Sequence, residues 1–230
     1  LLPALLFFFE PEVAVALTAV VHLLNGLFKL TLVGRHANLA LAARFGLPAV
    51  AAAFLGAWAL VGLSGSAPLF SYSFAGRSCE VTALKLGLGA LMLLFAALEL
   101  SKRWSAVAVP VRYAPLGGLV TGFFGGLSGH QGALRSAFLL RAGLSKEAFI
   151  ATGVLISAGV DLARLAVYGA RLGRVSLTEH GLLLAAAAVS AFAGALGGNL
   201  LLKKATFSGI QKAVAVLLAV IALGLGSGVL

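Results

Sequence analysis

The chain has 230 residues, of which 61% are hydrophobic and only 10% are charged, and its mean hydropathy is +1.07. A soluble domain carries about 25% charged residues, so this composition excludes an ordinary soluble protein. Several segments of about 20 residues hold one charge or none, which is the length that a helix needs to cross a bilayer. The sequence therefore predicts an all-α, polytopic membrane protein with the lipid bilayer as its surroundings.

The net charge of +10 comes from 17 Lys and Arg residues against 7 Asp and Glu residues. Cytoplasmic loops of membrane proteins are rich in Lys and Arg, so we expect no nucleic-acid partner. Cys79 is the only cysteine and the four histidines are scattered along the chain. No metal site is expected from such a set, and nothing in the sequence points to a cofactor.

The first half contains three predicted spanning segments. It begins with a short apolar run over residues 1–9, and Glu10, Pro11 and Glu12 then favour the start of a helix. The elements expected next are a helix over Glu12 to Val33, a basic loop over Gly34 to Asn38, a helix over Leu39 to Leu63 with a kink at Pro48, a loop over Ser64 to Ser78, a helix over Cys79 to Leu100, and a basic connection over Ser101 to Arg112.

The second half is expected to contain a broken helix and three further spans. The expected elements are a glycine-rich helix over Pro115 to Leu127, a short helix over Gln131 to Leu140, a loop over Arg141 to Lys146, a helix over Glu147 to Gly169, a basic loop over Ala170 to Thr178, and two helices over Glu179 to Leu202 and Phe207 to Leu230.

The most unusual stretch lies between the glycine-rich helix and the short helix. Six glycines fall between Gly117 and Gly129, another follows at Gly132, and polar residues lie among them. Glycine frees the backbone from helical geometry, and freed backbone groups at membrane depth need protein or a watery cavity around them. Close helix packing through small residues is the alternative. The polar residues favour a broken or re-entrant helix whose new start faces an anion, with substrate-binding residues Ser128, Gly129, His130, Gln131 and Gly132.

An internal repeat appears when the sequence is shifted by 135 residues. The segment from Glu12 to Gly34 then falls on the segment from Glu147 to Gly169, and Lys29 falls on Arg164. A cation inside the bilayer is costly to keep, so this match carries more weight than the apolar matches. We expect two transmembrane repeats, over residues 1–105 and 106–230, and we expect the first copy of the glycine motif to precede the residues given.

Loop charges predict that the two repeats have inverted topology. We assume that each long segment crosses the membrane once and that the glycine-rich helix and the short helix form a re-entrant pair, which enters and leaves on the same side. Nine cations then fall on one side of the membrane and three on the other. This asymmetry satisfies the positive-inside rule and puts matched loops on opposite sides, as in inverted-repeat transporters. The nine are Arg35, Arg44, Lys102, Arg103, Arg112, Arg141, Lys146, Lys203 and Lys204, and the three are Arg77, Arg171 and Arg174.

Ionisable residues inside the predicted spans complete the candidate site. Arg135 follows the break by one turn and suits bidentate binding of a sulfonate or carboxylate. Lys29 and Arg164 are further candidate anion ligands, although both could reach the headgroups, and Arg164 could pair with Asp161. Asp161, His22 and Asn25 are candidate coupling or gating residues, with helix–helix hydrogen bonding as the alternative for His22.

The glycine-rich break, the short helix with its nearby arginine and the following "SKEAFIAT" helix start resemble the sulfite exporter TauE/SafE family. Gly122, Gly125, Gly126, Gly129 and Gly132 represent the family's glycine pattern, while His130 and Gln131 stand where the family usually has further glycine. The resemblance implies export or exchange of a small sulfur-containing or carboxylated anion, such as sulfite, thiosulfate or an organosulfonate. We expect a multi-pass protein of a prokaryotic cytoplasmic membrane.

Two other functions remain open at this stage. One is an anion channel, in which the same cations would form a selectivity filter. The other is an intramembrane enzyme with Ser128 and His130 as catalytic groups, which lacks a third orienting residue nearby. We expect a transporter rather than an enzyme, and a homodimer is one assembly that the sequence allows.

Overall fold

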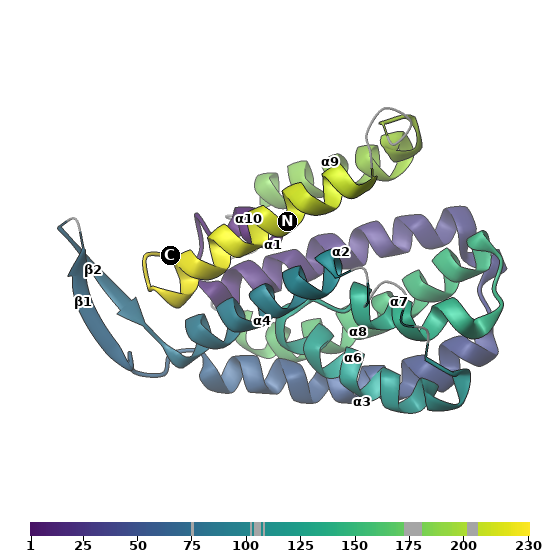
Figure 1. Cartoon of the computed structure of the whole chain (residues 1–230), viewed down its shortest axis with the longest axis horizontal. Helices are drawn as coiled ribbons and strands as arrows, with labels where there is room; N and C mark the ends of the chain where they lie inside the picture. Colours follow the sequence, from purple (N-terminus) through teal and green to yellow (C-terminus); the bar gives the residue numbers. More distant parts are fainter. Residues whose placement is uncertain (75, 102, 104–106, 108, 173–180, 202–206) are drawn as a thin grey trace.

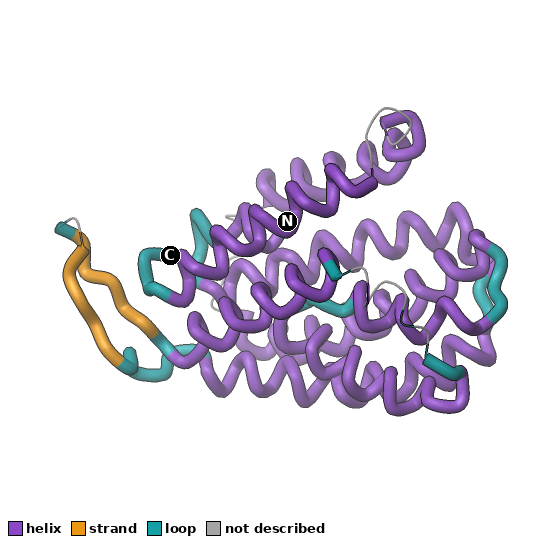
Figure 2. Tube along the Cα trace, viewed as in Figure 1, coloured by secondary structure: helices purple, strands orange, loops and turns teal. Residues whose placement is uncertain are grey.

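The computed structural model describes residues 1–74, 76–101, 103, 107, 109–172, 181–201 and 207–230. Most of these residues are helical (Figures 1 and 2). The elements are α1 (Leu2–Leu5), α2 (Pro11–Val33), η1 (Gly34–His36), α3 (Leu39–Leu63), β1 (Phe70–Phe74), β2 (Arg77–Val81), α4 (Ala83–Leu100), η2 (Val111–Tyr113), α6 (Ala114–Ser128), α7 (Gly132–Leu139), η3 (Leu140–Ala142), α8 (Lys146–Leu172), α9 (Gly181–Leu201) and α10 (Phe207–Gly226).

Four helices among the described residues are long and apolar enough to cross a membrane. They are Pro11–His36, Leu39–Leu63, Ala83–Leu100 and Lys146–Gly169. Large apolar side chains remain exposed on their outer faces, among them Leu47 and Trp58 of α3 at 71% and 74% exposure. Such exposure is expected where lipid is the solvent, and the predicted polytopic α-helical class is confirmed.

Local sequence explains where the long helices begin. Pro11 and Glu12 occupy the first turn of α2, where a missing N–H and a negative charge are both tolerated. The side chain of Asn38 accepts a hydrogen bond from the backbone N–H of Leu41 at 2.9 Å and caps α3. Thr82 caps α4 in the same way through the N–H of Lys85, at 3.2 Å.

The expected loop over Ser64 to Ser78 is wrong, because this region holds an antiparallel hairpin of β1 and β2. Phe70, Tyr72 and Phe74 alternate with serines, which is the period of a strand, and Gly76 lies in the turn with φ of 77°. The hairpin also moves the start of the third span from Cys79 to Ala83. The expected loop over Ala170 to Thr178 is partly helical, since α8 continues to Leu172, and its remainder lies outside the described residues.

Small residues allow α3 and α6 to pack backbone against backbone. A Cβ atom added at Gly118, Gly122 or Gly126 would meet backbone atoms of Phe45, Ala49 and Ala53, respectively. Dense small-residue packing of this kind is how membrane helices approach closely. The packing explanation therefore holds for these three glycines of the motif.

Helices α2 and α8 pack against each other and run in opposite directions (Figure 1). The backbone N–H of Asn38, just beyond α2, donates to Oγ1 of Thr152 near the start of α8, at 2.9 Å. Farther along, Gly26 lies against Val154 and Ala158. Opposite directions are what inverted repeats require, while the division of the chain at residue 105 stays a prediction.

The loops at the two ends of the helices agree with the predicted sidedness. Figure 1 places η1 and η3 at one end, which we call the basic end because it carries Arg35 and Lys146. The hairpin, which contains Arg77, projects from the opposite end. This arrangement positions the α6–α7 break between two ends of unequal charge.

Candidate functional site

The glycine-rich helix breaks at Gly129, as the sequence predicts. Helix α6 continues through Gly125 and Gly126 to Ser128, and Gly129 adopts the left-handed conformation with φ of 79°. Its N–H donates to the carbonyl of Gly125 at 2.9 Å, and α7 begins at Gly132. The break is thus shorter than expected, because only Gly129 to Gln131 leave helical geometry.

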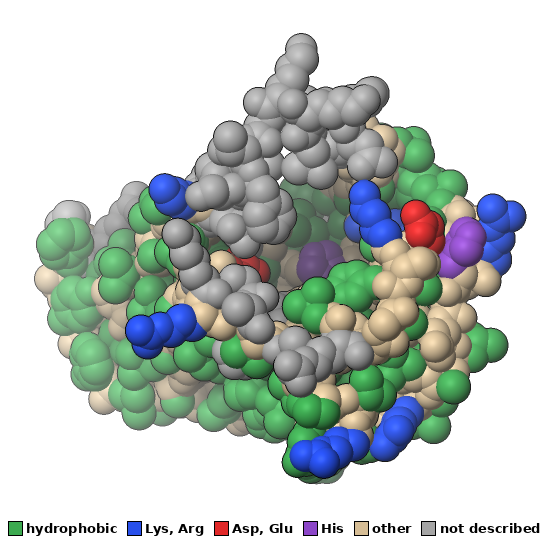
Figure 3. All heavy atoms as spheres, turned by 45° about the vertical axis from the view of Figure 1, so that its right-hand side comes forward, with side chains coloured by type: hydrophobic (Ala, Val, Ile, Leu, Met, Phe, Trp, Pro, Cys, Tyr) green, Lys and Arg blue, Asp and Glu red, His purple; other side chains and the backbone are tan. Residues whose placement is uncertain are grey.

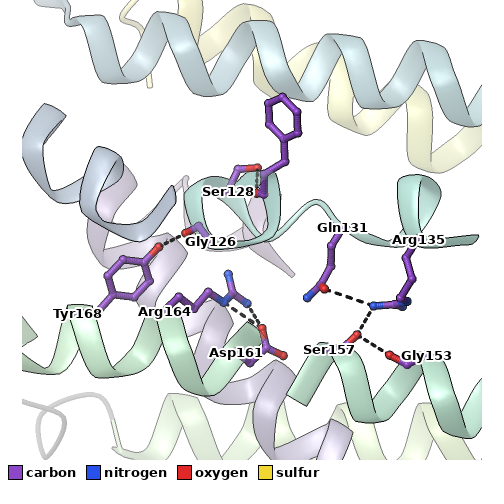
Figure 4. A network of polar contacts seen from close by, with 10 residues as sticks. Gly126, Ser128, Gln131, Arg135, Gly153, Ser157, Asp161, Arg164 and Tyr168 are labelled. Atoms are coloured by element: carbon purple, nitrogen blue, oxygen red, sulfur yellow. Dashed lines mark hydrogen bonds and ion pairs between the residues drawn. The ribbon is translucent and has the colours of Figure 1, made fainter. Parts of the chain in front are cut away.

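Arg164 of α8 lies directly under this break, between α6–α7 and α8 (Figure 4). Its Nε donates to Oδ1 of Asp161 at 2.9 Å, and its Nη2 lies 2.7 Å from the same oxygen. The side chains of Arg164 and Asp161 are 0% and 2% exposed. The predicted pairing of these two residues is present, and it neutralises one buried cation with one buried carboxylate.

One edge of the Arg164 guanidinium has no acceptor among the residues that the structure describes. Nη1 is buried and has no hydrogen-bond partner among the described residues, and Nη2 has only the ion pair with Asp161. A Cβ atom at Gly129 would lie 2.7 Å from Nη1. Leaving a buried charged donor unpaired is costly. The arrangement therefore favours an anion or water beside this edge.

Tyr168 ties α8 to the end of α6. Its hydroxyl donates to the carbonyl of Gly126 at 2.6 Å, a carbonyl in the last turn of α6 that the helix end leaves without an intrahelical partner. Tyr168 is 3% exposed and lies one turn beyond Arg164. It fixes the position of the break relative to Arg164. Sequence reasoning missed this residue, although its spacing of four from Arg164 places it on the same face of α8.

Arg135 of α7 belongs to a second network on the same face of α8 (Figure 4). Its Nη1 donates to Oε1 of Gln131 at 3.3 Å and to Oγ of Ser157. Ser157 donates in turn to the carbonyl of Gly153 at 3.1 Å. Arg135 also interacts electrostatically with Asp161. The structure thus brings Gln131, Arg135 and Ser157 together on this face of α8.

Ser128 and His130 form a separate pair, and the side chain of Ser128 lies on the side of α6 away from Arg164 (Figure 4). The hydroxyl of Ser128 donates to the carbonyl of Phe124 at 3.1 Å, and Nδ1 of His130 lies 3.3 Å from that hydroxyl oxygen. The ring of His130 stacks on Phe95 of α4, with centroids 5.5 Å apart. Because the serine proton points to a carbonyl, no observation here favours Ser128 as a nucleophile.

The three predicted site residues of α2, His22, Asn25 and Lys29, differ in how they interact with the break. His22 has an exposed side chain and interacts electrostatically with Arg164, His130 and Lys29. Oδ1 of Asn25 is buried without a hydrogen-bond partner. Within the described part of the chain, no hydrogen bond or ion pair joins Lys29 to the break. Gly132 begins α7 and is exposed, with nothing close to it.

Two buried threonines in helices α2 and α6 were missed from the sequence. The hydroxyl oxygens of Thr18 in α2 and Thr121 in α6 are buried, and neither has a hydrogen-bond partner in the part of the chain that the structure describes. Thr18 precedes His22 by four residues, so helical spacing could have identified it. Among the described residues, no group of three His, Cys, Asp or Glu side chains could hold a metal ion.

Comparison with known proteins decides the family. The model of the family described as "Sulfite exporter TauE/SafE" matches residues 1–225. The chain belongs to the sulfite exporter TauE/SafE family. Comparisons with curated proteins and with solved structures find no match. Together with the apolar helices, the TauE/SafE match identifies a multi-pass membrane protein of a transporter family.

Proposed function

We propose that this chain transports a small anion, such as sulfite, thiosulfate or an organosulfonate, across the cytoplasmic membrane of a prokaryote by alternating access. The anion binds at the α6–α7 break, beside Arg164. The direction follows the family description, which names an exporter. Neither the channel nor the enzyme alternative has an observation in its favour at this site.

The single observation that carries the proposal is the free edge of Arg164. Asp161 occupies Nε and one side of Nη2, and Nη1 is left without an acceptor beside Gly129. A planar guanidinium can give two parallel hydrogen bonds to the oxygens of one anion. A sulfite or sulfonate group has oxygens at the separation that such a pair of donors requires.

The surrounding charges favour an anion as well. The hydrogen-bond partners of Arg135, Gln131 and Ser157, are neutral. Arg164 pairs with Asp161, so two arginines and one carboxylate lie in this part of the site. This leaves an uncompensated positive charge in a region of low dielectric, where charge interactions are strong. An anionic ligand would neutralise that charge, and the ion pair with Asp161 would keep Arg164 in place when the site is empty.

The test is uptake of labelled sulfite into proteoliposomes that contain the purified protein. The informative variant is the double substitution Arg164→Gln with Asp161→Asn, since removing Arg164 alone would leave a buried, unpaired carboxylate. Loss of two charge-assisted hydrogen bonds predicts at least about tenfold weaker uptake. Arg44→Gln, at an exposed position of α3, is the control and keeps full uptake.

The concentration dependence of uptake separates a carrier from a channel. A carrier gives saturable uptake that an opposing anion gradient accelerates, whereas a channel gives flux that rises linearly with concentration. Linear flux, or full uptake by the double variant, would overturn the proposal.

A further inference from the structure

A polar stripe runs along α2 beside the candidate site. Thr18, His22, Asn25 and Lys29 follow one another at spacings of four, three and four, so they share one face of the helix. Polar and ionisable side chains inside a membrane helix face the protein interior or a water-filled cavity rather than lipid. The stripe is therefore a candidate lining of an aqueous space.

His22 indicates that this space is hydrated and adjoins the site. It lies in the middle of α2, yet its side chain is exposed. It also interacts electrostatically with Arg164, which is fully buried, and with His130 at the break. Because Gly26 of α2 lies against Ala158 of α8 and the two helices run in opposite directions, His22, one turn earlier, falls beside the part of α8 that carries Arg164. An exposed ionisable side chain at this depth is expected to face a water-filled cavity rather than lipid. Figure 3, with the basic end turned forward, shows a hollow with a histidine side chain at depth.

The neighbours of His22 on the stripe also need water or a ligand. The side-chain oxygens of Thr18 and Asn25 are buried without hydrogen-bond partners among the described residues. Buried polar atoms are normally satisfied by protein or by ordered water. Lys29 lies seven residues beyond His22, which is about 10 Å along the helix towards the basic end. Arg35 follows in η1 at that end.

We propose that the anion moves between Arg164 and the basic end along this stripe, and that Lys29 forms an outer anion-binding position on the way. This inference rests on the proposed function of the site. A flexible ammonium group is a point charge without the planar fork of arginine. Lys29 is thus suited to brief capture of an oxyanion, while Arg164 holds it in a defined orientation.

Cysteine labelling tests the path without requiring a transport assay. In a Cys79→Ala background, which removes the chain's single cysteine, His22→Cys, Asn25→Cys and Lys29→Cys are each treated with an anionic, membrane-impermeant methanethiosulfonate. Leu24→Cys and Leu27→Cys are matched controls, because these leucines are exposed on the opposite face of the same helix. Thermal unfolding in detergent confirms that each variant is folded.

We expect the stripe positions to react from the basic side at least about tenfold faster than the leucine controls, since a thiol in lipid stays protonated and unreactive. Sulfoacetate, an inert organosulfonate, should slow the reaction of His22→Cys and Asn25→Cys, in which Lys29 is retained. Equal rates on the two faces, reaction only from the opposite side, or no protection by sulfoacetate would overturn the path. A chain with this labelling pattern but no sulfite uptake would count against the proposed substrate and leave the path standing.

Discussion

At the scale of single residues, the site depends on a few positions that tolerate little substitution. Gly129 must adopt a positive φ and must also leave room for Nη1 of Arg164. Arg164 is identified from the sequence as a charge inside an apolar helix, and its pairing with Asp161 follows from a spacing of three. The role of Tyr168 cannot be predicted in this way, because its partner Gly126 lies on another helix and is chosen by tertiary packing.

Gly129→Ala tests whether the space above Arg164 matters for transport. The left-handed conformation costs an alanine about 1–2 kcal/mol, and the new methyl group would displace the guanidinium. Gly143→Ala is the matched control, since Gly143 also has a positive φ, of 64°, but nothing lies near it. We expect both variants to lose stability in thermal melts, Gly129→Ala more than Gly143→Ala, and we expect loss of sulfite uptake only in Gly129→Ala. Equal uptake by the two variants would contradict the placement of the site.

Tyr168→Phe removes the hydrogen bond that holds the end of α6. The carbonyl of Gly126 would then be buried and unsatisfied, at a cost of about 1–3 kcal/mol. We expect a lower unfolding temperature together with weaker substrate binding, because the break would no longer be fixed above Arg164. Tyr113→Phe, at a position that is 40% exposed, serves as the control. A variant with wild-type stability and uptake would show that this bond does not position the site.

At the scale of helices and strands, hydropathy and capping residues account for most of the observed elements. The predicted span over Leu39 to Leu63 coincides with α3, and the predicted start of α2 differs by one residue. The β1–β2 hairpin was missed because its serine-rich composition resembles a loop, although the alternation of Phe70, Tyr72 and Phe74 is a strand signal. Which residues leave helical geometry at the break could not be predicted from the sequence either, because packing against α3 keeps Gly126 helical.

The contact between α3 and α6 gives a prediction at this scale. A methyl group at Gly122 would meet the backbone of Ala49, which cannot move aside as a side chain can. Overpacking of this kind costs about 1–3 kcal/mol, so Gly122→Ala should lower the unfolding temperature. Gly87→Ala, in an exposed part of α4 with nothing nearby, should leave it unchanged or raise it slightly. Equal unfolding temperatures would mean that the two helices are not packed this closely.

At the scale of the whole molecule, the predicted sidedness follows from loop charges and agrees with the ends seen in Figure 1. The opposite directions of α2 and α8 agree with the inverted repeat predicted from the match of Lys29 and Arg164. What loop charges could not predict is that α2 packs on α8, the helix that carries Arg164, because this packing is set by tertiary structure.

Sidedness can be measured with single cysteines at the two ends. In the Cys79→Ala background, His36→Cys in η1 should react with an impermeant thiol reagent only from the cytoplasm, as the positive-inside rule requires. Gly76→Cys in the hairpin turn should react only from the outside. Reaction of both positions from the same side of intact cells would contradict the predicted topology.

The central claim is that Arg164 binds the transported anion at the α6–α7 break, and thermal unfolding of the purified protein with added anions tests it most directly. Sulfite, thiosulfate, sulfoacetate, taurine and simple carboxylates are compared, and a ligand at about 100 times its Kd should stabilise the protein by about 2.7 kcal/mol. We predict that at least one sulfur oxyanion raises the unfolding temperature of the wild-type protein and has no effect on the Arg164→Gln, Asp161→Asn double variant. The same increase in the wild type and in a folded double variant would contradict the claim.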